Sequence, residues 1–291
     1  MLLPQALLSY LAHEVVPSHI SKKIDESALD LNSVGFDRWG LQPDYLKAFI
    51  GLFWPLYKHY FKVKVYGAQH IPNGKVLLVS NHSGQIPIDA VLITIALLDQ
   101  SGNPRLSRAM IEYWVPSLPF IGDLFTRCGQ IIGDPSNFMD LLAHKQAILV
   151  FPEGVRGIGK PFKDRYQLQR FGTGFCRLAI EGKAPIVPVA VVGAEEIYPS
   201  LGNVTFLAKL LKMPYFPLTP FFPWLGVGGT IPLPIPIDIW FGEPQKIKAR
   251  ADCEDEAIAE NVNEIRSAIQ GLIDQGLAKR SGYWKHRRKI L

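Results

Sequence analysis

The sequence predicts an α/β fold with a mostly parallel central sheet, helices on both faces and a helical N-terminal lead-in. Two observations carry this prediction. Short apolar runs of strand length alternate along the chain with longer segments that suit helices. The runs beginning at Val76 and Ala147, and the run 186–192, are apolar at nearly every position, which is typical of parallel strands covered on both faces.

Residues 1–61 are expected to form a helical segment. Residues 1–43 contain scattered prolines and glycines, whereas residues 44–60 repeat apolar and aromatic side chains at spacings of three and four. The second stretch predicts an amphipathic helix kinked at Pro55, because proline lacks the N–H that a helix interior requires. Such a helix suits packing on the core and also suits an interfacial position on lipid. We therefore expect this lead-in to be able to associate with a membrane.

An α/β domain is expected over residues 62–278. Polar and apolar residues alternate over 62–66, which predicts a half-buried strand, and Asn73-Gly74 turns the chain into the run at Val76. Pro87 suits the first turn of a helix. Further strands are predicted over 108–112, 129–132, 147–151, 186–192 and 237–241. Helices are predicted over 87–98, 134–145, 172–181 and 254–275.

The most apolar segment, 215–241, does not predict a membrane-spanning helix. It contains one charged residue, Asp238, but six prolines and several glycines interrupt it. Each proline inside a helix removes a backbone hydrogen bond and clashes with the preceding turn. We expect extended loops that pack on the core or dip into the bilayer interface, and hence a peripheral rather than spanning protein.

The net charge of +5 is concentrated in a basic C-terminal tail, residues 279–291. This tail holds six Lys and Arg residues and no acid, so the rest of the chain is close to neutral. A basic tail beside Tyr283 and Trp284 suits an anionic membrane surface, and a solvated terminus is the alternative. A near-neutral domain does not suit binding to nucleic acid, which is not expected as a partner.

Cysteine usage and the N-terminus indicate a protein of the cytoplasm. Cys128, Cys176 and Cys253 are odd in number and form no paired motif, which predicts reduced thiols. The first residues lack the basic region and cleavage site of a secretory signal. We therefore expect a location on the cytoplasmic face of a membrane.

Polar residues follow two of the apolar runs, and their carboxyl ends should meet at one edge of a parallel sheet. His82 and then Asp89 follow the run at Val76, and Glu153 and Arg156 follow the run at Ala147. Histidine side chains titrate near neutral pH, and a carboxylate bonded to one ring nitrogen fixes the tautomer of the other. This chemistry suits a general base with an orienting group.

The spacing between His82 and Asp89 makes a structural demand. Along one continuous helix the two side chains would lie about 10 Å apart, too far for a hydrogen bond. Gly84 permits a chain reversal, and Pro87 keeps Ile86 out of the helical conformation. The prediction is a compact loop that returns Asp89 to within hydrogen-bond reach of His82.

Four motifs stand in an order that resembles the glycerolipid and lysophospholipid acyltransferases, over about residues 62–243. They are Asn81-His82-Ser83-Gly84 with Asp89, Pro119-Phe120-Ile121-Gly122 leading to Arg127, Phe151-Pro152-Glu153-Gly154-Val155-Arg156, and Ile186-Val187-Pro188-Val189. The resemblance implies transfer of a fatty acyl group from coenzyme A or acyl carrier protein to a hydroxyl of a glycerol-based lipid. It implies no metal and no bound cofactor beyond the acyl-carrying cosubstrate.

The resemblance also implies residue roles. His82 would take the proton from the acceptor hydroxyl, Asp89 would orient His82, and backbone N–H groups would stabilise the tetrahedral oxyanion. The expected acceptor contacts, which in the family often bind a phosphate, are Arg127, Glu153, Gly154, Val155 and Arg156. The expected partners are an acyl donor thioester, a lipid acceptor and a membrane surface.

Two departures from the family pattern affect these roles. Six residues separate His82 from Asp89, where the family usually has four, and Val155 replaces the usual Thr or Ser. The missing hydroxyl weakens the case for a phosphate-bearing acceptor. The Pro-rich segment 214–236 resembles the branch that acylates neutral acceptors such as diacylglycerol.

Other function classes fit the sequence less well. The stretch 154–160 has the glycine and lysine spacing of a P-loop, but Pro161 stands where a Ser or Thr must meet magnesium. The chain contains no G-x-S-x-G motif of a serine hydrolase, and its histidines are scattered rather than paired for a metal. A non-catalytic lipid-binding protein with the same fold stays open as an alternative.

Overall fold

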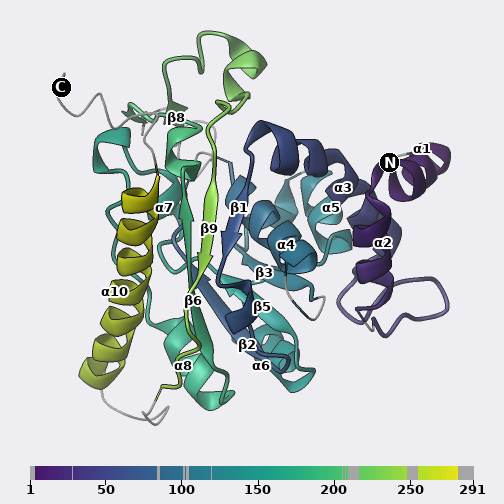
Figure 1. The fold of residues 1–291 in the computed structure, drawn as a ribbon, viewed down its shortest axis with the longest axis horizontal. Coiled ribbons are helices and arrows are strands. Elements are labelled where there is room, and N and C mark those ends of the chain that lie inside the picture. The colour runs from purple at the N-terminus through teal and green to yellow at the C-terminus, as the bar shows by residue number, and fades with distance from the viewer. Residues whose placement is uncertain are drawn as a thin grey trace.

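The computed structural model describes residues 4–27, 29–83, 86–100, 102, 105–118, 120–204, 206, 208, 216–247 and 255–280. Its centre is a seven-stranded sheet in the order β1-β9-β6-β2-β5-β3-β4 (Figure 1). Neighbouring strands are parallel except β6 and β9, which are antiparallel. The strands are β1 (Lys64–Tyr66), β2 (Val76–Ser80), β3 (Ser107–Ile111), β4 (Ile131–Ile132), β5 (Ala147–Val150), β6 (Ile186–Val192) and β9 (Asp238–Phe241). A small second sheet pairs β7 (Gly202–Asn203) with β8 (Pro217–Leu218).

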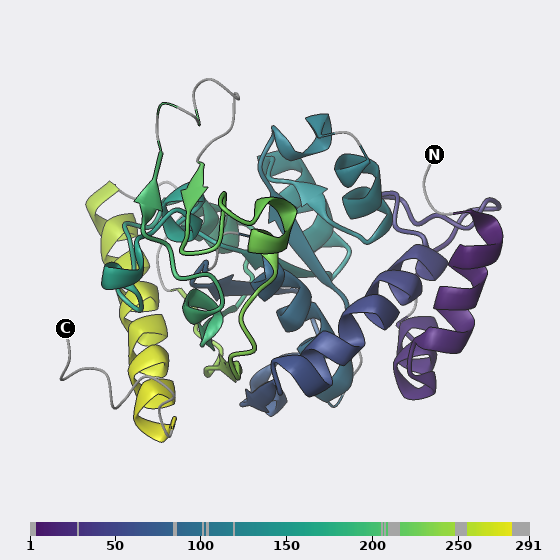
Figure 2. The same ribbon diagram turned by 90° about the horizontal axis from the view of Figure 1, so that it is seen from above.

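Helices cover both faces of the sheet, as predicted. In Figure 2, α10 lies on one side of the molecule and the N-terminal helices with α3 lie on the other. The α-helices are α1 (Gln5–Tyr10), α2 (Ser18–Asp25), α3 (Pro43–Pro55), α4 (Ile88–Gln100), α5 (Ile121–Arg127), α6 (Pro135–Ala143), α7 (Val155–Ile158), α8 (Gly174–Glu181) and α10 (Asp255–Lys279). Leu11–Val15 and Leu56–Tyr60 are π-helical, and 3₁₀ turns span Ala68–His70, Val115–Ser117, Phe162–Asp164, Ala194–Glu196 and Gly226–Thr230.

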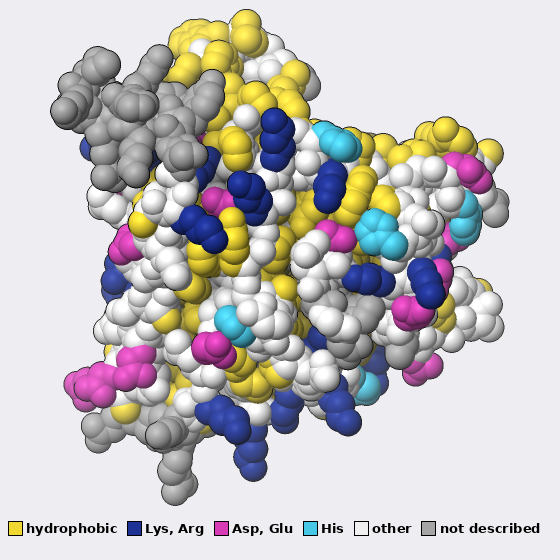
Figure 3. Space-filling model, in the orientation of Figure 1, with side chains coloured by type: hydrophobic (Ala, Val, Ile, Leu, Met, Phe, Trp, Pro, Cys, Tyr) yellow, Lys and Arg dark blue, Asp and Glu magenta, His cyan; other side chains and the backbone are white. Residues whose placement is uncertain are grey.

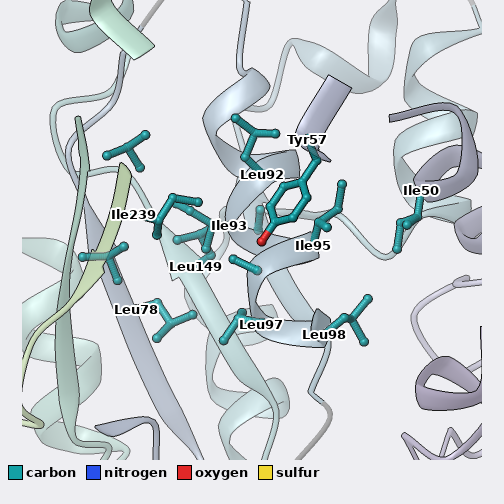
Figure 4. Close-up of a cluster of buried hydrophobic side chains, with 14 of the residues drawn as sticks. Ile50, Tyr57, Leu78, Leu92, Ile93, Ile95, Leu97, Leu98, Leu149 and Ile239 are labelled. Atoms are coloured by element: carbon teal, nitrogen blue, oxygen red, sulfur yellow. The ribbon is translucent and has the colours of Figure 1, made fainter. Parts of the chain in front are cut away.

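The alternation of side chains along the strands divides the core into two layers. Leu78 of β2 and Leu149 of β5 point into a cluster with Leu92 of α4 and Tyr57 (Figure 4). The neighbouring residues of the same strands point the other way, toward α6, α8 and α10. Because both faces are buried, the strands must be apolar at every position. This explains the continuous apolar runs of the sequence.

The N-terminal lead-in is helical, as predicted, and packs on the α/β domain. Ile20 and Ile24 of α2 and Ile50 of α3 are almost fully buried in the same cluster as α4. Pro55 ends α3, and the chain continues as a π-helix rather than as a regular helix with a kink. The start of the predicted tail also packs on the domain, with the Lys279 ammonium 4.1 Å from the ring centre of Tyr66. Residues 281–291 of that tail lie outside the described residues.

The predicted elements are confirmed, with ends that shift by up to four residues. The largest shift extends the last helix to Lys279, four residues beyond the predicted end at 275. The short helices α5 and α7 were not predicted, because four to seven residues are too few to show helical periodicity. No helix in the described parts of the chain has both the length and the apolar character that a bilayer crossing demands.

The proline-rich segment forms a projection at the carboxyl edge of the parallel strands. It belongs to the connection between β6 and β9, and its described residues 216–236 lead into the start of β9. Because β9 runs antiparallel to β6, this start lies at the same sheet edge as the end of β2. Its exposed apolar side chains are Phe221, Trp224, Leu225 and Ile231. Figure 3 shows hydrophobic side chains gathered on the projection at the top of the molecule.

Candidate active site

The register of the sheet brings His82 and Glu153 to the same level. Val79 of β2 pairs with Val150 of β5, and each site residue lies three positions beyond its paired residue. The His82 N–H consequently donates a 3.0 Å hydrogen bond to Oε1 of Glu153. The chain segments that follow these two neighbouring strands are thus joined directly.

The predicted pair of His82 and Asp89 is formed. Nδ1 of His82 lies 2.8 Å from Oδ2 of Asp89. An ionised carboxylate can only accept, so this bond places the ring proton on Nδ1 and leaves Nε2 with a free lone pair. Asp89 therefore lies within hydrogen-bond reach of His82, as the spacing demanded. Gly84, which was expected to permit the reversal, lies outside the described residues.

Asp89 is held in place by the backbone around it. Its side chain is fully buried in the first turn of α4. Oδ2 also accepts a 2.9 Å hydrogen bond from the Ser83 N–H, and Oδ1 accepts a 2.8 Å bond from the Ala90 N–H. A buried carboxylate costs free energy unless such donors surround it. These bonds compensate for its burial and fix the direction of its bond to His82.

Asn81 and Phe151 fix the backbone and the ring of His82. The Asn81 side chain donates to the Val191 carbonyl at 3.1 Å and accepts from the Val191 N–H at 2.8 Å. The amide thus continues the pairing of β2 with β6 past the end of β2. The His82 ring stacks on Phe151 with ring centres 4.2 Å apart and planes at 23°. The imidazole is therefore held both at its edge and at its face.

Glu153 acts on the backbone of the site. It is buried, with Oε1 accepting from His82 and Oε2 accepting a 2.8 Å bond from the Gln169 N–H. Lys160 Nζ lies 4.0 Å from Oε2 of Glu153 and 3.0 Å from Oε1 of Glu195. One buried cation therefore lies between two carboxyl groups. Burial raises the pKa of Glu195 to about 7, even though Lys160 opposes the rise.

A largely apolar cavity of about 280 Å³ opens beside His82. This volume is close to the lower end of small-molecule sites, about 300 Å³. Among the expected site residues, His82, Gly154 and Val155 line it. The other lining residues are Phe49, Ile86, Pro87, Ala90, Val91, Ala109, Met110, Ile111, Glu112, Trp114, Val115, Leu118, Ile121, Phe125, Cys128, Gln130, Phe151 and Ile158.

The two expected arginines lie outside the set of residues that line this cavity. Arg127 Nε binds Asp123 at 3.0 Å, and Nη1 binds Gln42 at 3.0 Å. Its guanidinium also lies 4.9 Å from the ring centre of Tyr45. Arg156 is exposed, and its Nη2 is 3.4 Å from the carbonyl oxygen of Arg170. Arg127 thus ties α5 to the N-terminal segment, and Arg156 faces solvent.

The cavity wall also carries a thiol. Cys128 lines the cavity, but burial raises the pKa of its thiol to about 12, so it carries no thiolate at neutral pH. Within the described ranges, no group of three or more His, Cys, Asp and Glu side chains is placed to hold a metal ion. The chemistry that these residues support is proton transfer by His82 beside an apolar cavity.

Comparison with known proteins assigns the family. A family model described as Acyltransferase matches residues 62–192. An uncharacterized Mycobacterium leprae protein, ML2427, is 39% identical over 250 residues, which cover 84% of this chain and 68% of that protein. The chain belongs to the acyltransferase family. The four motifs quoted from the sequence had indicated this membership.

Two further comparisons concern the fold and a distant enzyme. The crystal structure of the 1-acyl-sn-glycerophosphate acyltransferase PlsC from Thermotoga maritima superposes with a TM-score of 0.51 at 15% identity, over 95% of this chain and 98% of PlsC. It shares the fold. The mouse DGAT1/2-independent enzyme synthesizing storage lipids is 24% identical over 212 residues, covering 73% of this chain and 60% of the mouse protein.

Three contributors to the site were not predicted from the sequence. The stacking role of Phe151 and the contact of Gln169 with Glu153 depend on how separate segments meet in space. The sequence carried a signal for Glu112, because this charged residue is the last one of the predicted strand 108–112. Charged residues directly after parallel strands are candidates for the carboxyl edge.

Proposed function

We propose that the protein transfers a fatty acyl group from acyl-CoA or acyl carrier protein to a hydroxyl of a glycerol-based lipid, with His82 as general base. Family membership supports acyl transfer in lipid metabolism as the reaction class. The observation that carries the residue assignment is the 2.8 Å bond from His82 Nδ1 to Asp89, with the same ring on the wall of an apolar cavity. Nε2 is then available to the acceptor hydroxyl.

In this mechanism Nε2 of His82 removes the proton as the acceptor oxygen attacks the thioester carbonyl carbon. The tetrahedral intermediate collapses, the carbon–sulfur bond breaks, and the thiolate leaves with the proton that His82 gained. Asp89 keeps the proton on Nδ1 and stabilises the transient imidazolium. The acyl group passes directly from donor to acceptor, without a covalent bond to the protein.

We assign Gly154 and Val155 to the substrate wall of the cavity and Glu153 to positioning of His82. The two hydrogen bonds of Glu153 to backbone N–H groups support this assignment. The apolar lining suits acyl chains, because burial of each methylene group contributes about 0.8 kcal/mol. The Acyltransferase family model ends at Val192, so the Pro-rich projection lies beyond the matched region.

We also propose that the protein binds a cytoplasmic membrane surface as a peripheral protein, with its cavity edge toward the lipid. Trp114, Phe120 and Ile121 are exposed, and both Trp114 and Ile121 line the cavity as well. The exposed apolar side chains of the Pro-rich projection lie at the same sheet edge. Aromatic residues at the mouth of a lipid site suit the bilayer interface.

The direct test is acyl transfer from radiolabelled oleoyl-CoA to a panel of glycerolipid acceptors in mixed micelles. Wild-type protein should form product with at least one hydroxyl acceptor, and His82→Ala should lower kcat by at least about a hundredfold. A His82→Ala protein with full turnover would remove His82 from the chemistry. A wild type that binds lipid but transfers no acyl group would favour the lipid-binding alternative.

A further inference from the structure

We infer that the acceptor is a neutral acylglycerol without a phosphate group, and that Glu112 disfavours anionic acceptors. This inference rests on the function proposed above and specifies its substrate class. It follows from the charges that surround the cavity and from the places that the two expected arginines occupy.

The cavity wall carries a negative group and lacks a fixed positive one. Among the described residues that line it, Glu112 is the sole carboxylate, and none is Lys or Arg. Glu112 follows β3, and its Oε1 lies 3.5 Å from the position that a Cβ on Gly154 would occupy. Its side chain forms no ion pair with any described residue. A phosphate at this wall would meet an uncompensated like charge.

The residues that would bind a phosphate are absent, engaged elsewhere or, in the case of Arg156, exposed to solvent outside the cavity lining. Val155 has no hydroxyl to donate, and it lines the cavity at that position. Arg127 is bound to Asp123 and Gln42. An anion that enters a largely apolar cavity loses its hydration, and without a guanidinium or ammonium partner that loss is not compensated. A neutral glycerol backbone with ester groups does not incur this cost.

Glu112 thus contributes specificity by repulsion. Discrimination between two substrates requires only a difference in binding free energy, and an unfavourable charge contact with one of them supplies it. A carboxylate at the cavity wall leaves a neutral acylglycerol almost unaffected and opposes lysophosphatidate. The exposure of Glu112 to solvent limits the effect, and salt should reduce it further.

The test compares dioleoylglycerol with oleoyl lysophosphatidate as acceptors for oleoyl-CoA. In wild type, kcat/KM should favour the neutral acceptor by at least about tenfold at low salt, and added salt should narrow the ratio. Glu112→Gln should shift the ratio toward lysophosphatidate by about tenfold. The matched control Glu181→Gln removes the same charge from an exposed site on α8 and should leave the ratio unchanged.

A wild type that prefers lysophosphatidate, or a Glu112→Gln protein with an unchanged ratio, would overturn the inference. An Arg156→Ala protein with a raised KM for lysophosphatidate at saturating donor would also overturn it, because that arginine would then contact the phosphate-bearing acceptor. A binding measurement tests this inference independently of the proposed catalytic function. In the His82→Ala background, tryptophan fluorescence should report tighter lysophosphatidate binding after Glu112→Gln, and unchanged binding would count against the inference even without turnover.

Discussion

The N–H of His82 donates a hydrogen bond to Oε1 of Glu153, 71 positions away in the chain. The second oxygen of Glu153 accepts from Gln169. A residue that the family motif associates with the acceptor therefore has both oxygens directed at backbone N–H groups. The relationship makes Glu153 a positioning residue for His82, the proposed general base.

Glu153→Gln should lower kcat with little change in the KM of the acceptor. A glutamine supplies one acceptor oxygen, so one of two backbone N–H groups loses its partner, at a cost of about 1–3 kcal/mol in stability. The His82 loop should shift, and steady-state kinetics with a urea titration would measure both effects. A raised acceptor KM with an unchanged kcat would indicate instead that Glu153 binds the acceptor.

Asp89→Asn should lower kcat by at least about a hundredfold, because an amide can donate to Nδ1 and favour the wrong tautomer of His82. The control is Asp99→Asn on the same helix, whose carboxylate binds His19 at 3.2 Å and is not among the residues that line the cavity. Acyl transfer should survive that change. Equal losses in both variants would attribute the effect to α4 stability rather than to His82.

Cys128 should resist alkylation in the folded protein. Burial raises the pKa of its thiol to about 12, and the thiolate is the reactive form. Iodoacetamide at pH 8 followed by peptide mass spectrometry should find Cys128 unmodified in native protein and modified after denaturation. An acyl group attached to Cys128 during turnover would contradict direct transfer to the acceptor.

Glu195 should make stability fall as the pH rises. Its pKa moves from an ordinary value of 4.5 to about 7 in the folded protein, so the folded state holds the proton more tightly than the unfolded state. That contribution is complete below about pH 4.5 and is lost as the pH rises through about 7. Between pH 5 and 8, wild type should lose on the order of 2 kcal/mol relative to Glu195→Gln, measured by urea denaturation. A constant difference would show that Glu195 ionises normally.

Replacement of Trp114 and Phe120 by serine should weaken binding to anionic phospholipid vesicles in a sedimentation assay. Both side chains are exposed, Trp114 lines the cavity, and Phe120 directly precedes the lining residue Ile121. Each removes a large apolar area from water when it enters the interface. The control Val34→Ser changes an exposed apolar residue of the N-terminal loop, away from the cavity lining. Equal vesicle binding by the wild type, the variant with both serine replacements and the Val34→Ser control would place the lipid contact elsewhere.

The sequence by itself determined the α/β class, the buried strands and the pairing of His82 with Asp89. These features depend on local patterns, because apolar runs predict buried strands, and the glycine and proline after His82 indicate the reversal. The acyltransferase family also followed from motifs within short segments. Such features need few contacts between distant parts of the chain.

The tertiary structure decided which residues face the cavity. Glu153 turns toward the His82 backbone because the register of β2 and β5 brings the two residues level, and Arg127 turns away because Asp123 and Gln42 bind it. Glu112 joins the cavity because β3 lies beside β5. These directions arise from contacts between segments far apart in the chain, and motif spacing does not encode them.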